Sequence, residues 1–159
     1  MKSCTEYQQS LPTPLGTLYI RATTDAIFSV SFDDNTSAQE GTSNHLTRAC
    51  SIQLQEYFDS RRRFFDLPLA PHGSAYSRTV WQLLRAEILW GQQITYGELA
   101  RRAGRPGSAR ATGRVVGANP IGIIIPCHRV VAAHGGLGGF GWGIERKVWL
   151  LNHEKKQGL

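Results

Sequence analysis

A short stretch with the composition of a linker, residues 66–73, divides the chain into two parts with different hydrophobic patterns. Before it, residues 15–22 and 26–32 alternate apolar and polar side chains, and a Thr-Thr-Asp turn joins them, which predicts a β-hairpin. After it, apolar residues recur mostly at helical spacing. The sequence therefore predicts an α+β protein, with a small N-terminal α/β domain at residues 1–72 and a mainly helical domain at residues 73–159.

The N-terminal part also contains one predicted helix. Its apolar positions recur at helical spacing, and they are Leu46, Ala49, Cys50, Leu54, Tyr57 and Phe58. Because Cys50 lies on this stripe, we expect it to be a packed core thiol. The chain has three cysteines, too few and too scattered for a disulfide framework, and it has no CxxC or HxxxH pair. We therefore expect no metal site.

Two longer helices are predicted at the ends of the C-terminal part. The hydroxyl of Ser74 can cap the first of them. The apolar positions of that helix are Val80, Trp81, Leu83, Leu84, Ile88 and Leu89. The second is an amphipathic helix from Ile144 to about Lys155. We expect its inward side chains to be Val148, Leu150 and Leu151.

Two short helices around a tight turn lie between them. Thr95 can cap residues 96–103, with Glu98 at the capping-box position. A Gly-Arg-Pro-Gly turn breaks the chain, and Ser108 can cap a further helix that Asn119-Pro120 stops. The pattern predicts a helix-turn-helix whose second helix presents arginines to DNA, and a structural helical hairpin is the alternative.

The charge of the chain is unevenly distributed. Residues 1–95 carry eight Lys and Arg against nine Asp and Glu, whereas residues 96–159 carry ten against three. A basic second half favours a polyanion such as nucleic acid as partner, and ordinary solvated surface charge is the alternative. No apolar run approaches the ~20 residues that span a bilayer, and the N-terminus lacks a secretory signal. We therefore expect a cytoplasmic protein without membrane contacts.

Cys127 follows a fully apolar, β-like run, residues 121–125, that we expect to be buried. A thiol is a strong nucleophile only as the thiolate, and the neighbouring His128 and Arg129 could lower its pKa. Adjacent side chains on an extended strand point in opposite directions, so His128 reaches Cys127 only if the backbone turns or a water relays the proton. Pro126 makes such a turn credible. From these residues alone, Cys127 is either a buried structural cysteine or a nucleophile.

The hexapeptide Ile125-Pro126-Cys127-His128-Arg129-Val130 resembles the active-site signature of the O6-alkylguanine-DNA alkyltransferases. Further segments resemble family blocks in the right order, and the matches together span residues 74–154. These segments are TYGELA at 95–100, ARATG at 109–113, Asn119-Pro120, WGIERK at 142–147 and LLNHE at 150–154. The N-terminal hairpin, with Pro14-Leu15-Gly16, resembles the first domain of the family.

The resemblance implies a reaction and the roles of four residues. Cys127 is implied as the acceptor of an alkyl group from O6-alkylguanine, and from O4-alkylthymine, in double-stranded DNA. His128 is implied as its base through a water, and Glu154 as the carboxylate that orients His128. Asn119 is implied as the polar link between the second short helix and the active-site turn. The thioether product has no good leaving group, so each molecule would act once, as a monomer and without a cofactor.

The resemblance also implies how DNA is bound. O6 of guanine is stacked inside the duplex, so the nucleotide must be flipped out after docking in the minor groove. Arg110 matches the arginine that fills the gap, and Tyr96 matches the residue that crowds the phosphate and contacts the flipped base. The implied base pocket is formed by Tyr96, the backbone of Val130 and Gly141, and Trp142. The resemblance implies Ser77, Tyr96 and Arg110 as DNA contacts, and the basic helix-turn-helix adds Arg105 and Arg114 to them.

Several positions depart from the family pattern. Phe140 stands where a tyrosine is usual, Gly141 stands where Ser or Arg is frequent, and Arg114-Val115-Val116 replaces smaller or polar residues. Substrate range and DNA affinity are the properties that these changes put in question, and the reaction is not. Some members bind structural zinc, and Cys4 matches one ligand. Thr23 and Phe28 stand where other ligands would be, which predicts no metal.

Three rival functions remain at this point. A non-catalytic sensor of alkylated DNA would bind the lesion without transfer. A helix-turn-helix regulator would bind a specific sequence in the major groove. A cysteine hydrolase using Cys127 and His128 would turn over acyl substrates.

Overall fold

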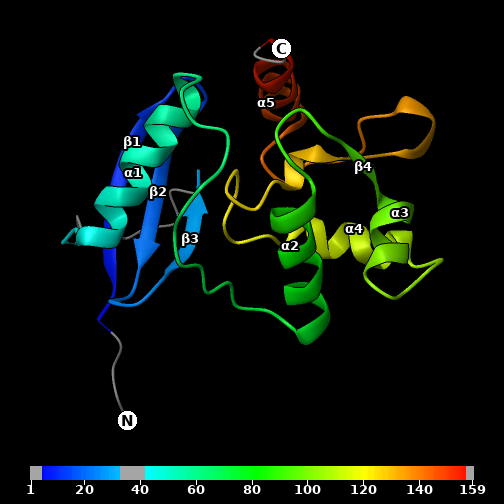
Figure 1. Cartoon of the computed structure of the whole chain (residues 1–159), viewed down its shortest axis with the longest axis horizontal. Helices are drawn as coiled ribbons and strands as arrows, with labels where there is room; N and C mark the ends of the chain where they lie inside the picture. Colours follow the sequence, from blue (N-terminus) through cyan, green and yellow to red (C-terminus); the bar gives the residue numbers. More distant parts are fainter. Residues whose placement is uncertain (1–4, 33–41, 157–159) are drawn as a thin grey trace. The chain divides into compact units, whose positions relative to one another are not determined.

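The computed structural model describes residues 5–32 and 42–156, and these form two compact units (Figure 1). Of the described residues, the first unit comprises 5–32, 42–72 and Pro120–Gly122, and the second comprises Gly73–Asn119 and 123–156. Three residues from the C-terminal part thus belong to the first unit, although the predicted boundary assigns them to the second. The α+β class predicted from the sequence is confirmed.

The first unit is a three-stranded antiparallel sheet covered by one helix, as Figure 1 shows in blue and cyan. The predicted hairpin is confirmed, and the predicted helix is present. Cys50 on that helix is fully buried, and burial raises its pKa to about 12, so the predicted core thiol is confirmed. The elements are β1 (Tyr7–Thr13), β2 (Gly16–Ala22), β3 (Ile27–Ser31) and α1 (His45–Phe58).

The strand β1 was not predicted from the sequence. Its residues, YQQSLPT, have little apolar alternation and include Pro12. In the described sheet β1 pairs only with β2, so it is an edge strand, where a proline removes no essential hydrogen bond. The strand is fixed by its seven-residue register with β2 rather than by a hydrophobic pattern of its own.

The apolar run at 121–125 is buried as predicted, but its β-like pattern does not form a strand. Ile121 forms one isolated bridge with Val30, flanked by hydrogen bonds from Val30 N to Pro120 O (2.9 Å) and from Gly122 N to Val30 O (3.1 Å). The chain then turns at Ile123, which has a φ of 69°. A left-handed conformation is costly for a β-branched residue, and the fully packed surroundings of Ile123 hold it there.

The second unit is mainly helical, with one short two-stranded parallel sheet and two 3-10 turns. The four expected helices are present, and the middle pair packs together as the helix-turn-helix predicts. No described helix is long and apolar enough to cross a membrane. The elements are α2 (Ala75–Glu87), β4 (Ile94–Thr95), α3 (Tyr96–Arg102), α4 (Ala109–Gly117), η1 (Cys127–Arg129), β5 (Val130–Val131), η2 (Ala133–Gly135) and α5 (Ile144–Lys156).

The predicted caps of these helices are confirmed in two cases out of three. Ser74 Oγ accepts from Ser77 N at 3.1 Å, and Thr95 Oγ1 accepts from Glu98 N at 3.1 Å. Ser108 occupies the cap position of α4, but its side chain makes no cap hydrogen bond because its backbone (φ −100°, ψ 38°) is not extended.

Three side chains differ from their predicted places. Glu98 does not complete a capping box, because its carboxylate pairs with two arginines one turn further along α3. Leu89 lies beyond the end of α2 and is 55% exposed, since the helix ends at Glu87. Val148 is 36% exposed, so only Leu150 and Leu151 of the three predicted inward residues of α5 are buried.

The capping difference gives a matched pair of stability variants. Ser74→Ala should lower the free energy of unfolding by about 1 kcal/mol, because it removes a formed cap hydrogen bond. Ser108→Ala should change it by less than about 0.5 kcal/mol, because the Ser108 side chain caps nothing. Urea denaturation of the two variants measures this, and equal losses would contradict the assigned caps.

Candidate active site

Cys127 lies at the start of a tight 3-10 turn, η1, that follows the buried apolar run. Cys127 N donates to Ile125 O at 2.8 Å, and Arg129 N donates to Pro126 O at 3.0 Å. Pro126 thus begins a backbone turn at this point. The turn buries Cys127 and its two successors together, with Cys127 7% exposed and His128 0% exposed.

Glu154 from α5 lies against this turn and accepts hydrogen bonds from two of its residues. His128 Nε2 is 2.6 Å from Glu154 Oε2. Arg129 donates from Nε to Oε1 at 2.8 Å and from a terminal nitrogen to Oε2 at 3.0 Å. The other terminal nitrogen of Arg129 donates to Ile88 O at 2.7 Å, which ties the cluster to the end of α2. All of these side chains are buried.

The cluster fixes the protonation states of His128 and Glu154. Burial alone would raise the pKa of Glu154, but the hydrogen bonds from His128 and Arg129 and the charge of Arg129 hold that pKa well below its ordinary value. Burial lowers the pKa of His128 despite the opposing effect of Glu154, and the charges of Arg129 and Lys147 lower it further. We therefore assign an ionised Glu154 and a neutral His128.

This assignment determines the tautomer of the imidazole ring. An ionised carboxylate can only accept, so the His128 proton sits on Nε2 and donates to Glu154. Nδ1 then carries the free lone pair. Nδ1 is buried and has no hydrogen-bond partner among the described groups. A neutral imidazole with an uncommitted nitrogen, next in sequence to a thiol, is suited to accept a proton.

Asn119, at the end of α4, connects that helix to the thiol. Its side-chain Nδ2 donates to Ile125 O at 2.9 Å, and the side chain also hydrogen-bonds Cys127. Burial raises the pKa of the Cys127 thiol, and the Asn119 hydrogen bond and the charge of Lys147 only partly offset that. The resting thiol is therefore protonated at neutral pH and needs a base to become a nucleophile.

Lys147 is a site residue that the sequence pattern did not indicate. It is fully buried, and its Nζ donates to Val130 O at 2.6 Å and to Gly139 O at 3.2 Å. Nζ also lies 5.8 Å from the centre of the Tyr96 ring. Burial lowers the pKa of Lys147, and the charge that Cys127 carries as a thiolate opposes this. Helical periodicity cannot reveal such a residue, because a lysine on a helix is normally solvated.

Tyr96 lies between α4 and the glycine-rich loop, residues 134–143. Its hydroxyl donates to Gly139 O at 3.4 Å, and its ring faces Gly113 of α4. Gly138 is required on the other side, because a Cβ there would come within 2.9 Å of the Tyr96 ring and φ at this position is +72°. Phe140 and Trp142 are in edge-to-face contact further along the loop, and the intervening Gly141 is exposed.

The arginines of the α3–α4 pair fall into two groups. Arg101 and Arg102 are engaged by the Glu98 carboxylate on α3. Within the described part of the chain, the other three are exposed and make no ion pair, and they are the three predicted DNA contacts Arg105, Arg110 and Arg114. Ser77, the remaining predicted contact, lies in the first turn of α2, where its hydroxyl accepts from Ser74 at 3.0 Å.

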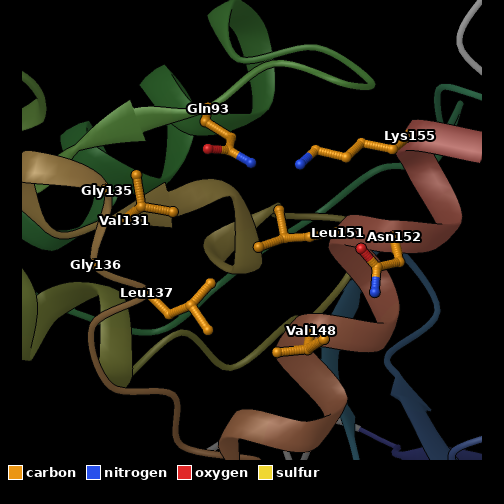
Figure 2. A pocket seen from close by; sticks show the side chains of 9 residues that line it. All are labelled: Gln93, Val131, Gly135, Gly136, Leu137, Val148, Leu151, Asn152 and Lys155. Carbon is orange, nitrogen blue, oxygen red and sulfur yellow. The ribbon is translucent and has the colours of Figure 1, made fainter.

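A cavity of about 230 Å³ lies between the glycine-rich loop and α5, and Figure 2 shows Gln93 and Lys155 facing each other across it. Its walls are mixed, with four aliphatic side chains, three polar side chains and two glycines, and none of the predicted site residues lines it. The cavity is therefore not part of the cluster around Cys127. The lining residues are Gln93, Val131, Gly135, Gly136, Leu137, Val148, Leu151, Asn152 and Lys155.

The described residues contain no group of three or more metal-ligating side chains. Cys4, the residue that resembles a family zinc ligand, lies outside the described residues, so its part in the metal prediction stays a prediction. Thr23 forms the hairpin turn, where its Oγ1 accepts from Asp25 N at 3.2 Å.

The two units and their order match a pair of family models. Residues 7–71 match the ribonuclease-like domain of 6-O-methylguanine DNA methyltransferase, and residues 75–156 match its DNA-binding domain. The solved structure of Mycobacterium tuberculosis O6-methylguanine methyltransferase superposes with a TM-score of 0.87 at 33% identity, covering 97% of this chain and 95% of that one. The same organism's OGT, solved in complex with DNA, gives a TM-score of 0.87 at 33% identity, covering 96% and 94%.

Curated relatives give the same result. The Haemophilus influenzae methylated-DNA--protein-cysteine methyltransferase is 37% identical over 155 residues, which covers 94% of this chain and 86% of the relative. The protein of the same name from Salmonella typhimurium is 50% identical over 105 residues, which covers 65% of this chain and 61% of the relative. The chain thus spans about three fifths of some relatives that it matches. It belongs to the 6-O-methylguanine DNA methyltransferase family.

The surroundings of Cys127 predict the pH dependence of its reactivity. In a Cys4→Ser/Cys50→Ala background, alkylation of Cys127 by iodoacetamide should rise with pH and have its midpoint above the ordinary pKa of a thiol, because burial dominates. Asn119→Ala and Lys147→Met should each move the midpoint higher, since each removes a group that stabilises the thiolate. Peptide mass mapping against pH measures this, and a midpoint below that of free cysteine would contradict the assignment.

Proposed function

We propose that this protein repairs DNA by moving an alkyl group from O6 of guanine to the sulfur of its own Cys127, once per molecule. The observation that carries the proposal is the buried cluster in which Glu154 holds a neutral His128, next in sequence to Cys127 on the same buried turn. Relatives that carry the name methylated-DNA--protein-cysteine methyltransferase support it. A neighbour of the same fold solved with DNA supports DNA as the partner.

The proposed reaction follows from the protonation states of the cluster. Nδ1 of His128 takes the Cys127 proton through a water, and Glu154 stabilises the imidazolium that forms. The thiolate attacks the alkyl carbon, a carbon–sulfur bond forms and the carbon–oxygen bond breaks. The electron pair of that bond goes to the guanine O6, and the imidazolium then gives up its proton to the base. The thioether that remains has no good leaving group, so Cys127 is not regenerated.

The proposed base pocket is lined by backbone groups that the described contacts hold in place. Val130 O already accepts from Lys147, and a carbonyl has a second lone pair with which it can accept from the exocyclic amine of guanine. The backbone of Gly141 is proposed to contact O6, and Trp142 to line the rim. Asn119 is proposed to orient the thiol, since it bonds both Ile125 O and Cys127. Alkylated O4 of thymine is a further proposed substrate.

The proposed DNA surface is formed by α2, α3 and α4. Arg105 and Arg114 carry free charges for backbone phosphates, and Ser77 supplies a small hydroxyl. Arg110, in the first turn of α4, is proposed to enter the stack through the minor groove and replace the flipped base. Tyr96 is proposed to crowd the phosphate of that nucleotide. We also propose that the protein acts as a monomer in the cytoplasm, whose reducing conditions suit a reaction that needs the free thiol found at Cys127.

The proposal is tested by measuring the mass of the intact protein before and after reaction with alkylated DNA. Incubation with an oligonucleotide duplex containing O6-methylguanine should add the mass of one methyl group to the intact protein, and tryptic mapping should place it on Cys127. Cys127→Ser should gain nothing while still binding the duplex, and Glu154→Gln should react at least tenfold more slowly because the imidazolium loses its counter-charge. Binding of the duplex without any gain of mass by the wild type would instead indicate a lesion sensor or a regulator.

Two glycines of the glycine-rich loop give a matched pair of variants for the rate of methyl transfer. Both Gly138 and Gly135 have positive φ, but only at Gly138 would a Cβ meet the Tyr96 ring, whereas nothing lies within 4 Å at Gly135. Gly138→Ala should therefore slow methyl transfer several-fold more than Gly135→Ala, because it displaces Tyr96. Single-turnover rates measure the difference. Equal rates in the two variants would show that the Tyr96 position does not matter for transfer.

A further inference from the structure

Tyr76, in the first turn of α2, joins two parts of the proposed DNA surface within the second unit. Its ring lies beneath the guanidinium of Arg105, with the guanidinium carbon 3.9 Å from the ring centre. Its hydroxyl is 2.6 Å from Thr112 Oγ1 on α4. Thr112 is fully buried and lies two residues beyond Arg110. One side chain thus contacts both the turn before α4 and α4 itself.

The contact with Arg105 differs from the ion pairs of the neighbouring arginines. Arg101 and Arg102 point their N–H groups at Glu98, and Arg102 also pairs with Glu87, so carboxylates engage the donors of both arginines. A guanidinium stacked on a ring keeps its in-plane N–H donors and its charge available, because the ring occupies only its face. Arg105 is exposed and, among the described residues, has no carboxylate partner. The stack therefore orders the side chain without consuming its hydrogen-bonding capacity.

Such ordering matters for binding. A free arginine side chain loses up to about 2 kcal/mol of rotamer entropy when it is fixed on a ligand. A side chain that is already held loses less, so its contact is stronger and its direction is set before DNA arrives. Ser77, adjacent to Tyr76, is itself a proposed phosphate contact, which places the stack on the same turn of α2 as that contact.

We propose that Tyr76 is a positioning residue for DNA, which holds Arg105 ready for one backbone phosphate of the duplex and fixes α4 through Thr112. The proposal rests on the proposed function, because it takes DNA as the ligand. Tyr76 itself touches no reacting atom, and its effect is on affinity and not on the rate of alkyl transfer once DNA is bound.

The stack is tested by binding to an unmodified duplex at several salt concentrations. Tyr76→Leu should weaken binding three- to tenfold and reduce the slope of log K against log salt by about 0.9, the value for one lost phosphate contact. Arg105→Ala should have the same effect, and Tyr76→Leu/Arg105→Ala should be no weaker than Arg105→Ala. Tyr76→Phe keeps the ring and should keep the full slope. Thr112→Val is the matched control for Tyr76→Phe, because it removes the same Tyr76–Thr112 hydrogen bond from the other side. It should likewise keep the full slope.

A second measurement needs no disruptive variant and decides the matter if Tyr76→Leu does not fold. In the free wild-type protein, ¹⁵N relaxation should show the Arg105 Nε more ordered than that of Arg110, which has no stacking partner among the described residues. Equal mobility of the two would overturn the proposal. So would additive losses for Tyr76→Leu and Arg105→Ala, or Tyr76→Leu binding like the wild type.

The failure of this inference is distinguishable from failure of the proposed function. If the wild type binds duplex and gains a methyl group while Arg105→Ala binds equally well, the positioning role is wrong and the repair function stands. If the wild type neither binds duplex nor gains mass, the proposed function itself is wrong.

Discussion

The site depends on one buried carboxylate. Glu154 accepts from His128 and twice from Arg129, and Arg129 in turn bonds Ile88 O at the end of α2. An ion buried to this degree is costly unless it is paired and hydrogen-bonded on both oxygens, and both oxygens of Glu154 are bonded. The cluster therefore ties α5, the 3-10 turn and the end of α2 together. It also gives His128 a free Nδ1. Arg129 supplies the formal positive charge that keeps Glu154 ionised while the imidazole of His128 stays neutral.

The second constraint is the way Lys147 and Tyr96 hold the glycine-rich loop, residues 134–143. Lys147 holds Val130 O and Gly139 O from within α5, while Tyr96 packs against Gly138 and bonds Gly139 O. A buried ammonium with two carbonyl partners keeps its charge close to the thiol, where it favours the thiolate. The same helix thus supplies Glu154 for the base and Lys147 for the nucleophile. In the proposed function, α5 orients the reacting groups and α2–α4 orient the DNA.

Much of this could be predicted from the sequence. The alternation at residues 16–31 and the caps at Ser74 and Thr95 indicate the hairpin and the helices, because they reflect local hydrogen bonding and burial. The candidate residues around Cys127 came from the resemblance, since no periodicity connects position 127 to position 154.

The features that could not be predicted from the sequence depend on tertiary packing. The edge strand β1 has no apolar pattern, the positive φ of Ile123 is imposed by its packed surroundings, and Lys147 is buried only because two carbonyls meet it. The stack of Arg105 on Tyr76 joins residues 29 positions apart, and only the fold brings them together.

The central claim is that Glu154 holds His128 as a neutral base, and the ring nitrogens of His128 test it most directly. We expect the ¹⁵N spectrum of the free protein at neutral pH to show a His128 ring with its proton on Nε2 and an unprotonated Nδ1. The Glu154→Gln protein should lose this preference, since an amide can either donate to Nε2 or accept from it. A wild-type His128 that carries a proton on Nδ1, as an imidazolium or as the opposite tautomer, would contradict the claim.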